Sequence, residues 1–192
     1  MSGAQEMNEG LNPWDTGKPQ RAFVDLETAG EILGSVLDIG CGTGENAMYM
    51  AQKGYRTVGV DSSPNSIAKA MLKSAHRNLP VKFIIFDALQ LEHLGMIFDT
   101  IIDSGQFHLY DHDTRPHYVR SLGRVLKPEG YLHMLCISEG NFGNFGPKRV
   151  TKGDFRFYFS EGWEVKAIRN ARLEVNYGRG WNWAWLATIQ RR

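Results

Sequence analysis

Residues 36–47 constrain this chain most, because a short apolar run there leads into three closely spaced glycines. Val36–Ile39 predicts a buried parallel strand, and Glu45–Lys53 predicts a helix that ends at Gly54. Strand, turn and helix form the first half of a βαβ unit, whose loop lies at the sheet edge where open α/β folds bind ligands. Glycines let that loop approach a ligand closely, and the helix N-terminus adds unpaired N–H groups.

The spacing of the glycines favours one kind of ligand over another. A dinucleotide fingerprint has the form G-x-G-x-x-G and holds a pyrophosphate. Here the glycines are Gly40, Gly42 and Gly44, and Glu45 takes the third glycine position of the fingerprint, where its carboxylate would repel a pyrophosphate. Asp38, two residues before the first glycine, suits an ammonium group instead.

A second acid narrows the choice of ligand further. Asp61 ends the next apolar run, Thr57–Val60, and an acid at that place typically receives the two hydroxyls of a ribose. The two acids together require a nucleoside with a cationic amine and no diphosphate. S-adenosylmethionine meets this requirement, with S-adenosylhomocysteine as its product. A dinucleotide-dependent oxidoreductase remains the alternative.

These motifs resemble those of the class I S-adenosylmethionine-dependent methyltransferases. The resemblance rests on Val36–Ala47 together with Val58–Pro64, and it extends over about residues 12–190. It implies that the glycine turn, Asp61 and Ser62 contact the cofactor.

The next two strands end in further acids. Val81–Phe86 predicts a third strand, which leads into Asp87 and Ala88. The resemblance assigns Asp87 and Ala88 to the adenine, although a helix N-cap would equally explain Asp87. Phe98–Asp103 predicts a fourth strand, and the resemblance places Asp103, at its end, beside the transferable methyl group.

The segment after the fourth strand is rich in reactive and aromatic side chains. A histidine among aromatics and a carboxylate suggests a general base in a partly apolar pocket, which makes His108 the first catalytic candidate and Tyr110 the second. Phe107 is expected to contact the acceptor. A lone histidine is more often structural, so that alternative stays open for His108.

Two further segments are candidates for acceptor contacts. The Pro-Trp-Asp-x-Gly-x-Pro pattern of residues 13–19 resembles the thiopurine, halide/thiol and heterocyclic-toxin methyltransferases. This implies that Trp14 closes over cofactor and substrate, the alternative being that it packs on the sheet edge. Phe142 and Phe145 lie in a glycine-rich loop typical of a lid. Arg149 is expected to help hold an acceptor anion.

Composition bounds the remaining possibilities. The 192 residues suit one domain, which we expect at 12–192 after a disordered tail at 1–11. A net charge of +1 without a basic block disfavours nucleic acid as a partner. No apolar run approaches the roughly 20 residues of a membrane span. Cys41 and Cys136 form no metal spacing and are expected to be reduced, so we predict a cytoplasmic protein without a metal. As a separate expectation, the protein is a monomer or weak homodimer.

The last two strands complete the predicted fold. Trp163–Arg169 and Asn182–Gln190 are joined by a short connection, which predicts an antiparallel hairpin. We therefore expect a single-domain, Rossmann-like, doubly wound α/β sheet of seven strands, mostly parallel with one antiparallel strand near the C-terminus. Trp181, Trp183 and Trp185 alternate and should share one sheet face, covered by helices.

The predicted activity is methyl transfer from S-adenosylmethionine to a hydroxyl, thiol or ring nitrogen of a small aromatic or heterocyclic molecule. His108 favours oxygen, because a hydroxyl acceptor needs a base. The alternatives are a methyltransferase of thiols, halides or oxyanions, and a non-catalytic protein that binds S-adenosylmethionine.

Overall fold

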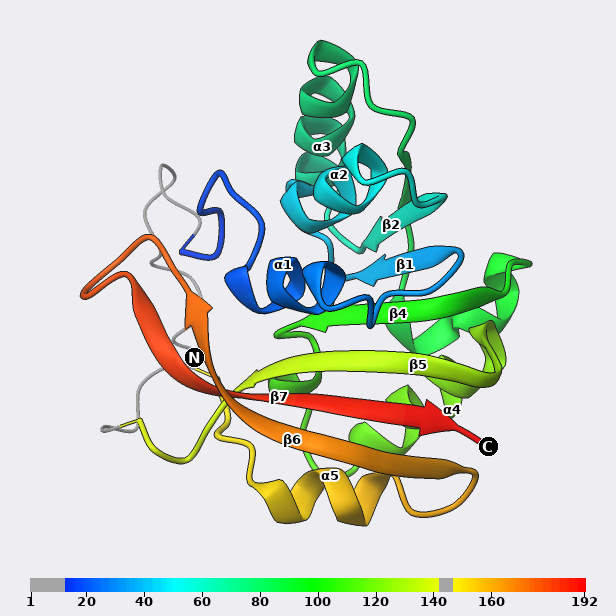
Figure 1. The fold of residues 1–192 in the computed structure, drawn as a ribbon, viewed down its shortest axis with the longest axis vertical. Helices are drawn as coiled ribbons and strands as arrows, with labels where there is room; N and C mark the ends of the chain where they lie inside the picture. The colour runs from blue at the N-terminus through cyan, green and yellow to red at the C-terminus, as the bar shows by residue number, and fades with distance from the viewer. Residues whose placement is uncertain (1–12, 142–146) are drawn as a thin grey trace, which may run out of the picture.

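The computed structural model describes residues 13–141 and 147–192. Their strands form one sheet in the order β3-β2-β1-β4-β5-β7-β6 (Figure 1). The strands are β1 (Val36–Ile39), β2 (Thr57–Asp61), β3 (Lys82–Ile85), β4 (Phe98–Ser104), β5 (Leu126–Ile137), β6 (Trp163–Glu174) and β7 (Trp181–Arg191). The helices are α1 (Arg21–Thr28), α2 (Glu45–Gln52), α3 (Pro64–His76), α4 (Arg115–Val125) and α5 (Lys152–Tyr158), with 3-10 helices η1 (Ala88–Leu94) and η2 (Phe107–Leu109). The predicted tail lies outside the described residues.

The pairing directions confirm the predicted topology. Strand β1 pairs in parallel with both β2 and β4, whereas β7 runs antiparallel to β5 and to β6. The reversed strand is therefore β7. Because successive strands are added on opposite sides of β1, the loops that follow β1 and β4 meet at the point where open α/β sheets bind ligands.

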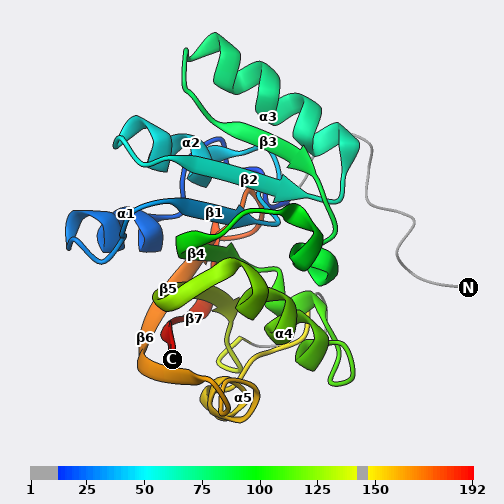
Figure 2. The same cartoon turned by 90° about the vertical axis from the view of Figure 1, so that its right-hand side faces the viewer.

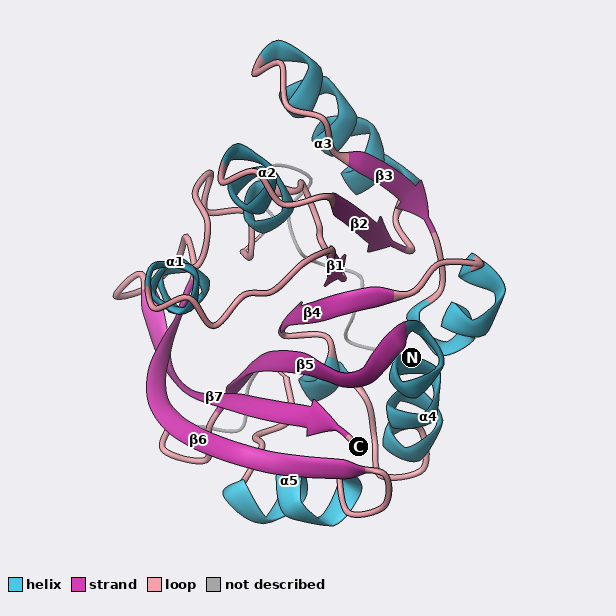
Figure 3. Cartoon of the chain, turned by 45° about the vertical axis from the view of Figure 1, so that its right-hand side comes forward, coloured by secondary structure: helices cyan, strands magenta, loops and turns pink. Residues whose placement is uncertain are grey.

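Helices cover both faces of the sheet, which explains the apolar runs of the central strands. On β1, Val36 packs in a cluster with Phe23 of α1, while Leu37 and Ile39 pack with Tyr118 of α4 on the other face. Figure 3 shows α1 and α2 on one side of the sheet and α4 on the other. Figure 2 shows α3 and α5 at opposite ends of the sheet.

Two element boundaries lie close to residues with positive φ. Helix α1 ends at Thr28, and the chain turns at Gly30, where φ is 74°. Near its start, β5 contains an irregularity, with Glu129 at φ 62° and a register shift opposite Phe98 and Thr100.

The tryptophans of β7 were predicted to be covered by helices, but two of them are not. Trp183 is 43% exposed, and the Trp181 ring lies under the guanidinium groups of Arg172 and Arg179, at 4.2 and 3.9 Å. These two rings lie near the tip of the β6–β7 hairpin, which projects beyond the helices (Figure 1), so arginines of the hairpin itself cover them. Trp185 contacts a helix residue, Lys152 of α5, whose Nζ lies 4.4 Å from the ring centroid.

The described residues contain neither a membrane-spanning helix nor a cluster of side chains that could hold a metal ion. No helix in residues 13–141 or 147–192 has the length and apolar character that crossing a membrane requires. Nor do these residues bring together three or more histidine, cysteine, aspartate or glutamate side chains in a way that would hold a metal ion. Cys41 and Cys136 are free and buried.

Candidate active site

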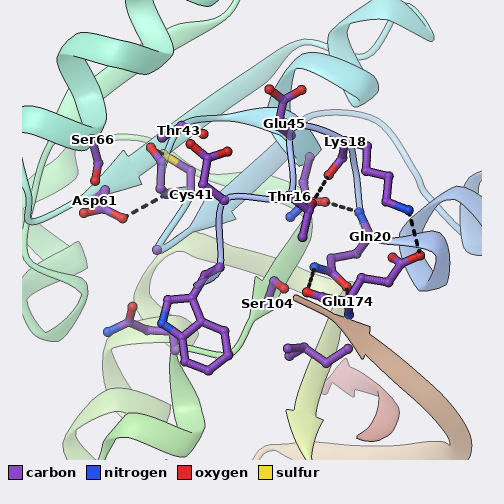
Figure 4. A pocket seen from close by; sticks show the side chains of 18 of the residues that line it. Thr16, Lys18, Gln20, Cys41, Thr43, Glu45, Asp61, Ser66, Ser104 and Glu174 are labelled. Atoms are coloured by element: carbon purple, nitrogen blue, oxygen red, sulfur yellow. Dashed lines mark hydrogen bonds and ion pairs between the residues drawn. The ribbon is translucent and has the colours of Figure 1, made fainter. Parts of the chain in front are cut away.

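A cavity of about 270 Å³ lies where the loops after β1 and β4 meet. The loop of residues 13–20, which we call the N-terminal loop, forms one wall, and the glycine turn and the start of α2 form another. Figure 4 shows Asp61 and Ser66 at one side, and Gln20 with Glu174 of β6 at the other. The cavity thus joins segments from both ends of the chain.

The glycine turn requires glycine for two reasons. Gly44 is the N-cap of α2 with φ 87°, and a Cβ there would lie 2.6 Å from the Phe83 ring. Gly40 has φ 64°, and its Cβ would lie 2.4 Å from Gln106 Oε1. The turn is therefore packed against β3 and against the loop after β4, and Gly40 and Gly42 line the cavity.

Asp61 braces the glycine turn. Its Oδ2 accepts from the Gly42 N–H at 2.9 Å, and its Oδ1 accepts from the Ser63 N–H at 2.8 Å. Each carboxylate oxygen has a further lone pair, so Asp61 can also accept ribose hydroxyls from the cavity. Ser62 is exposed and outside the lining, and Ser66 of α3 lines the cavity instead.

Asp38 lies buried behind the turn. Its Oδ2 accepts from the Ala47 N–H at 3.0 Å, whereas its Oδ1 is buried with no hydrogen-bond partner among the described residues. Burial raises the pKa of Asp38 well above its usual value, and the carboxylates of Asp61 and Asp103 add to this rise. A buried acceptor without a partner is costly, and a nearby cation would relieve it. Asp38 is not among the residues that line the cavity, so it would act on a ligand's cationic amine from behind the glycine turn.

Asp103 shapes the loop after β4 rather than lining the cavity. It is fully buried and accepts from the N–H groups of Gln106 at 2.7 Å and Phe107 at 3.2 Å, and from the Tyr118 hydroxyl at 2.9 Å. Burial raises its pKa to about 7. These bonds wind the chain into η2, which turns His108 toward the cavity and Phe107 into the core.

His108 is buried and neutral. Its Nδ1 accepts from the Ile137 N–H at 3.2 Å, which leaves the ring proton on Nε2. Burial lowers the pKa of His108 to about 3, and the positive charges of Arg115 and Arg149 lower it further in the same direction. The remaining ring nitrogen is thus a hydrogen-bond donor at neutral pH. This bonding favours a donor role over the predicted general base.

The structure does not bring Tyr110 and Phe107 to the cavity. The Tyr110 hydroxyl accepts from Gln106 Nε2 at 2.7 Å, and burial raises its pKa to about 12, so the phenol stays protonated. Phe107 is fully buried and stacks on Phe155 of α5, with 6.1 Å between the ring centroids.

Other predicted residues also lie away from the lining. Asp87 is exposed and accepts from the Leu89 N–H at 2.9 Å as the N-cap of η1, and Ala88 is buried in the core. Arg149 is half-buried and donates to the Pro147 carbonyl oxygen at 2.8 Å. Phe142 and Phe145 lie outside the described residues.

The N-terminal loop carries Trp14 over the cavity. Its ring centroid lies 6.2 Å from that of His108 and 6.2 Å from that of Tyr177. At the other end of the loop, Gln20 Nε2 donates to the Glu174 carbonyl oxygen at 3.0 Å, and the Glu174 N–H donates to Gln20 Oε1 at 2.8 Å. This pair of hydrogen bonds fastens the N-terminal loop to β6.

Glu45 does not carry an unbalanced charge. Lys73 Nζ lies 2.9 Å and Arg77 Nη1 2.7 Å from its carboxylate oxygens. Burial acts to raise the pKa of Glu45, but the hydrogen bonds from Arg77 and Lys73 prevail and hold it below its usual value. The inference that Glu45 would repel a pyrophosphate is therefore weak, and the choice of cofactor needs independent support.

The sequence analysis missed most of the lining. Some of these residues lie within the two motifs without having been singled out as site residues, and the others, such as Gln20 and Glu174, are brought to the cavity only by the fold. The missed residues are Asp15, Thr16, Lys18, Gln20, Cys41, Thr43, Glu45, Asn46, Ser66, Ser104, Gly105, Gln106, Leu109, Leu173 and Glu174.

Known proteins supply the support that the geometry needs. Residues 36–130 match a family described as Methyltransferase domain. A 2-heptyl-1-hydroxyquinolin-4(1H)-one methyltransferase of Mycobacteroides abscessus is 34% identical over 167 residues, which are 85% of this chain and 74% of that protein. The chain belongs to the S-adenosylmethionine-dependent methyltransferases. The oxidoreductase alternative is thereby excluded.

Two further similarities are to proteins whose name or title refers to a sulfur compound. A probable thiol methyltransferase 2 of Arabidopsis thaliana is 28% identical, over 89% of this chain and 77% of that protein. A solved structure concerned with conversion of a disulfide bond into a thioacetal group during echinomycin biosynthesis is 34% identical, with a TM-score of 0.87 over 95% of this chain and 86% of that one.

The residues present fit S-adenosylmethionine, which when bound supplies a methyl group activated by a sulfonium charge. The unpartnered oxygen of Asp38 suits its cationic amine, and Asp61 suits its ribose. The protein's main task is then to align the reactants, and such positioning can contribute roughly 7–11 kcal/mol. Trp14 would exclude water from the reacting centre, which strengthens the electrostatic interactions there.

Proposed function

We propose that this methyltransferase transfers the methyl group to an acidic hydroxyl on a planar heteroaromatic small molecule. The observation that carries the proposal is the state of His108, the one ionisable side chain among the described residues that line the cavity beside the loop after β4. Its Nδ1 is occupied by the Ile137 N–H, so it offers a proton rather than accepting one. An acceptor that is already anionic at neutral pH needs no base.

Charge supports the same conclusion. The positive charges of Arg115 and Arg149 both act on His108. The same field stabilises an anionic acceptor, and His108 Nε2 can donate a hydrogen bond to it, because charge-assisted hydrogen bonds are stronger than neutral ones.

Shape and similarity favour a planar ring. The Trp14 and His108 rings flank the cavity at an interplanar angle of 50°, with Leu109 beside them. The relative from Mycobacteroides abscessus is named for a hydroxyquinolinone, whose hydroxyl sits on such a ring system. A neutral ring nitrogen would gain nothing from the arginines.

A thiol is the second candidate, because the Arabidopsis relative is named as a thiol methyltransferase. Thiols also ionise near neutral pH, with an ordinary pKa of about 8.5 for cysteine. Halides and oxyanions would use the positive field but leave the aromatic contacts unused.

The test compares acceptors of different acidity. Purified protein with S-adenosylmethionine is offered 2-heptyl-1-hydroxyquinolin-4(1H)-one, thiophenol or phenol, and methylated products are identified by mass spectrometry. We expect the first to be the best acceptor and phenol the poorest. We also expect kcat/KM to follow the ionisation of the acceptor, with no inflection near a histidine pKa of about 6.5. Equal turnover of phenol, or such an inflection that disappears in His108→Asn, would contradict the proposal.

We further propose that the protein is a monomer or weak homodimer that acts on small molecules without binding nucleic acid. Light scattering after size exclusion, and a mobility-shift assay with duplex DNA and RNA, test these two points.

A further inference from the structure

Lys73 joins the two walls of the cofactor cavity described above. Its Nζ donates to Thr43 Oγ1 at 2.8 Å, to Glu45 Oε1 at 2.9 Å and to Asp15 Oδ1 at 3.3 Å. These partners belong to the glycine turn, to the first residue of α2 and to the N-terminal loop, and each lines the cavity. An ammonium group has three N–H donors, so this geometry uses all of them.

The charges show why one cation matters at this point. Burial acts to raise the pKa of Asp15, but the Thr43 hydroxyl and the Lys73 ammonium prevail and hold it below its usual value. Arg77 pairs with Glu45 and has no ion pair with Asp15 in the described residues. Without Lys73, Asp15 would lose its cation while lying near the Glu45 carboxylate.

Asp15 is next to Trp14 in the chain, so the contact of Lys73 with Asp15 helps to position the backbone that carries the indole. Asn176 also holds this end of the loop, through its N–H to the Pro13 carbonyl oxygen and its Nδ2 to the Asp15 carbonyl oxygen, both at 3.0 Å. The opposite end is held by Gln20 and Glu174. Loss of Lys73 would therefore loosen the Asp15 side chain and the glycine turn while these main-chain contacts remain.

We propose that Lys73 is a positioning residue that holds the N-terminal loop and the glycine turn in the arrangement that binds S-adenosylmethionine. It acts through Asp15, Thr43 and Glu45 and does not take part in methyl transfer. The proposal concerns the cofactor and does not depend on the identity of the acceptor.

The first test measures binding of S-adenosylhomocysteine by isothermal titration. Lys73→Met should raise Kd about tenfold or more, as expected for losing charge-assisted hydrogen bonds. Lys69→Met is the matched control, because Lys69 is an exposed lysine of the same helix outside the cavity lining. It should bind within about twofold of wild type, a change of less than 0.5 kcal/mol. Lys73→Arg, which keeps the charge, should recover part of the affinity.

The second test asks whether the effect passes through the loop. The change in tryptophan fluorescence on ligand binding, assigned to Trp14 by its absence in Trp14→Phe, should be reduced in Lys73→Met and unchanged in Lys69→Met. Asp15→Asn removes the charge that pairs with Lys73 but keeps an acceptor oxygen, and it leaves the contacts of Lys73 with Thr43 and Glu45 in place, so it stays informative if Lys73→Met fails to fold. It should weaken binding by part of the Lys73→Met effect, and the double variant should be no worse than Lys73→Met.

Three results would overturn the proposal. These are wild-type affinity in Lys73→Met, equal losses in the two lysine variants, or losses from Asp15→Asn and Lys73→Met that simply add. A structural role alone would lower the melting temperature without the coupling between Asp15 and Lys73.

Discussion

The two ends of the cavity carry opposite charge. Beside the glycine turn lie the carboxylates of Asp38 and Asp61, held largely by backbone N–H groups. Beside His108 act the cations of Arg115 and Arg149. The cofactor is a sulfonium cation and the proposed acceptor is an anion, so we infer that each end suits one reactant. From this difference we propose that the enzyme sorts its cofactor and its acceptor by charge before any chemistry occurs.

The two ends are also built differently. Acids at the cofactor end are fixed by hydrogen bonds from main-chain groups next to them, which few substitutions can alter. At the other end, Arg115 lies over the Phe107 ring at 4.6 Å and 3.4 Å from Asp154 of α5, so side chains from separate elements create the field. We infer that acceptor choice can change more readily than cofactor choice.

The largest effect is expected from a substitution at the cofactor end of the cavity. Asp61→Asn keeps the size of the side chain and removes its charge together with one acceptor oxygen. We expect Kd for S-adenosylhomocysteine to rise about a hundredfold, as for a lost charge-assisted pair of hydrogen bonds, with KM for the acceptor little changed. Isothermal titration and steady-state kinetics measure the two quantities. A larger effect on the acceptor than on the cofactor would break the division between the ends.

A second buried histidine, His133, allows the effect of burial on a histidine pKa to be measured outside the active site. His133, in β5, bonds Thr188 Oγ1 at 3.2 Å and the Glu31 carbonyl oxygen at 3.1 Å, and it does not line the cavity. Burial lowers its pKa to about 4, with Arg169 acting in the same direction and the Glu31 contacts opposing.

The pH dependence of stability follows from that lowered pKa. The unfolded chain takes up the proton near pH 6.5 and the folded chain only near pH 4, so acidification destabilises the folded state across this window. Going from pH 7 to pH 5, His133→Gln should therefore lose about 2 kcal/mol less of its free energy of unfolding than wild type. Urea titrations at the two pH values measure this. An equal loss in both proteins would show that His133 is not buried neutral. Methyl transfer at pH 7 should be unaffected.

A smaller effect is expected at the acceptor end. Arg149→Gln should raise KM for an anionic acceptor about tenfold, roughly the worth of one partly screened charge, and leave Kd for S-adenosylhomocysteine unchanged. The adjacent exposed cation supplies the control, Lys148→Gln, which should change KM by less than twofold, about 0.4 kcal/mol. If both variants change KM for the acceptor equally, the positive charge that acts at His108 comes from the surface in general and not from Arg149.

The smallest effect is expected at Asp87. Asparagine caps helices about as well as aspartate, so Asp87→Asn keeps the N-cap and removes only the charge. Both carboxylate oxygens are already bonded, to the Leu89 N–H and to Gln90 Nε2, and the residue is outside the lining. We expect Kd for S-adenosylhomocysteine within about twofold of wild type, that is within 0.5 kcal/mol. A tenfold loss with unchanged melting temperature would instead support the adenine contact that the sequence predicts.

The residues of the site that could be predicted from sequence are those whose positions depend on local structure. The glycine turn and Asp61 could be identified because a strand, a tight turn and a helix place a ligand site within a few residues of the chain. The seven-stranded, mostly parallel sheet with one antiparallel strand near the C-terminus followed from the alternation of elements and was confirmed.

The residues that were missed depend on long-range packing. Lys73 and Thr43 are 30 positions apart, and nothing in the sequence of α3 marks one lysine above the next. Phe107 and His108 were predicted to face the acceptor together. A single turn of 3-10 helix, wound around Asp103, sends these neighbours in different directions, and a sequence pattern cannot report that turn.

The bond between Gln20 and Glu174 spans 154 positions and has a consequence for how the enzyme is made. Domains form while the chain leaves the ribosome from its N-terminus. A nascent chain that has released β1 to β5 already contains the glycine turn and Asp61, but it lacks the partner that fastens the N-terminal loop. Complete enclosure of the methyl donor therefore waits for the final hairpin, so a translation product that stops before β6 would leave the cavity open.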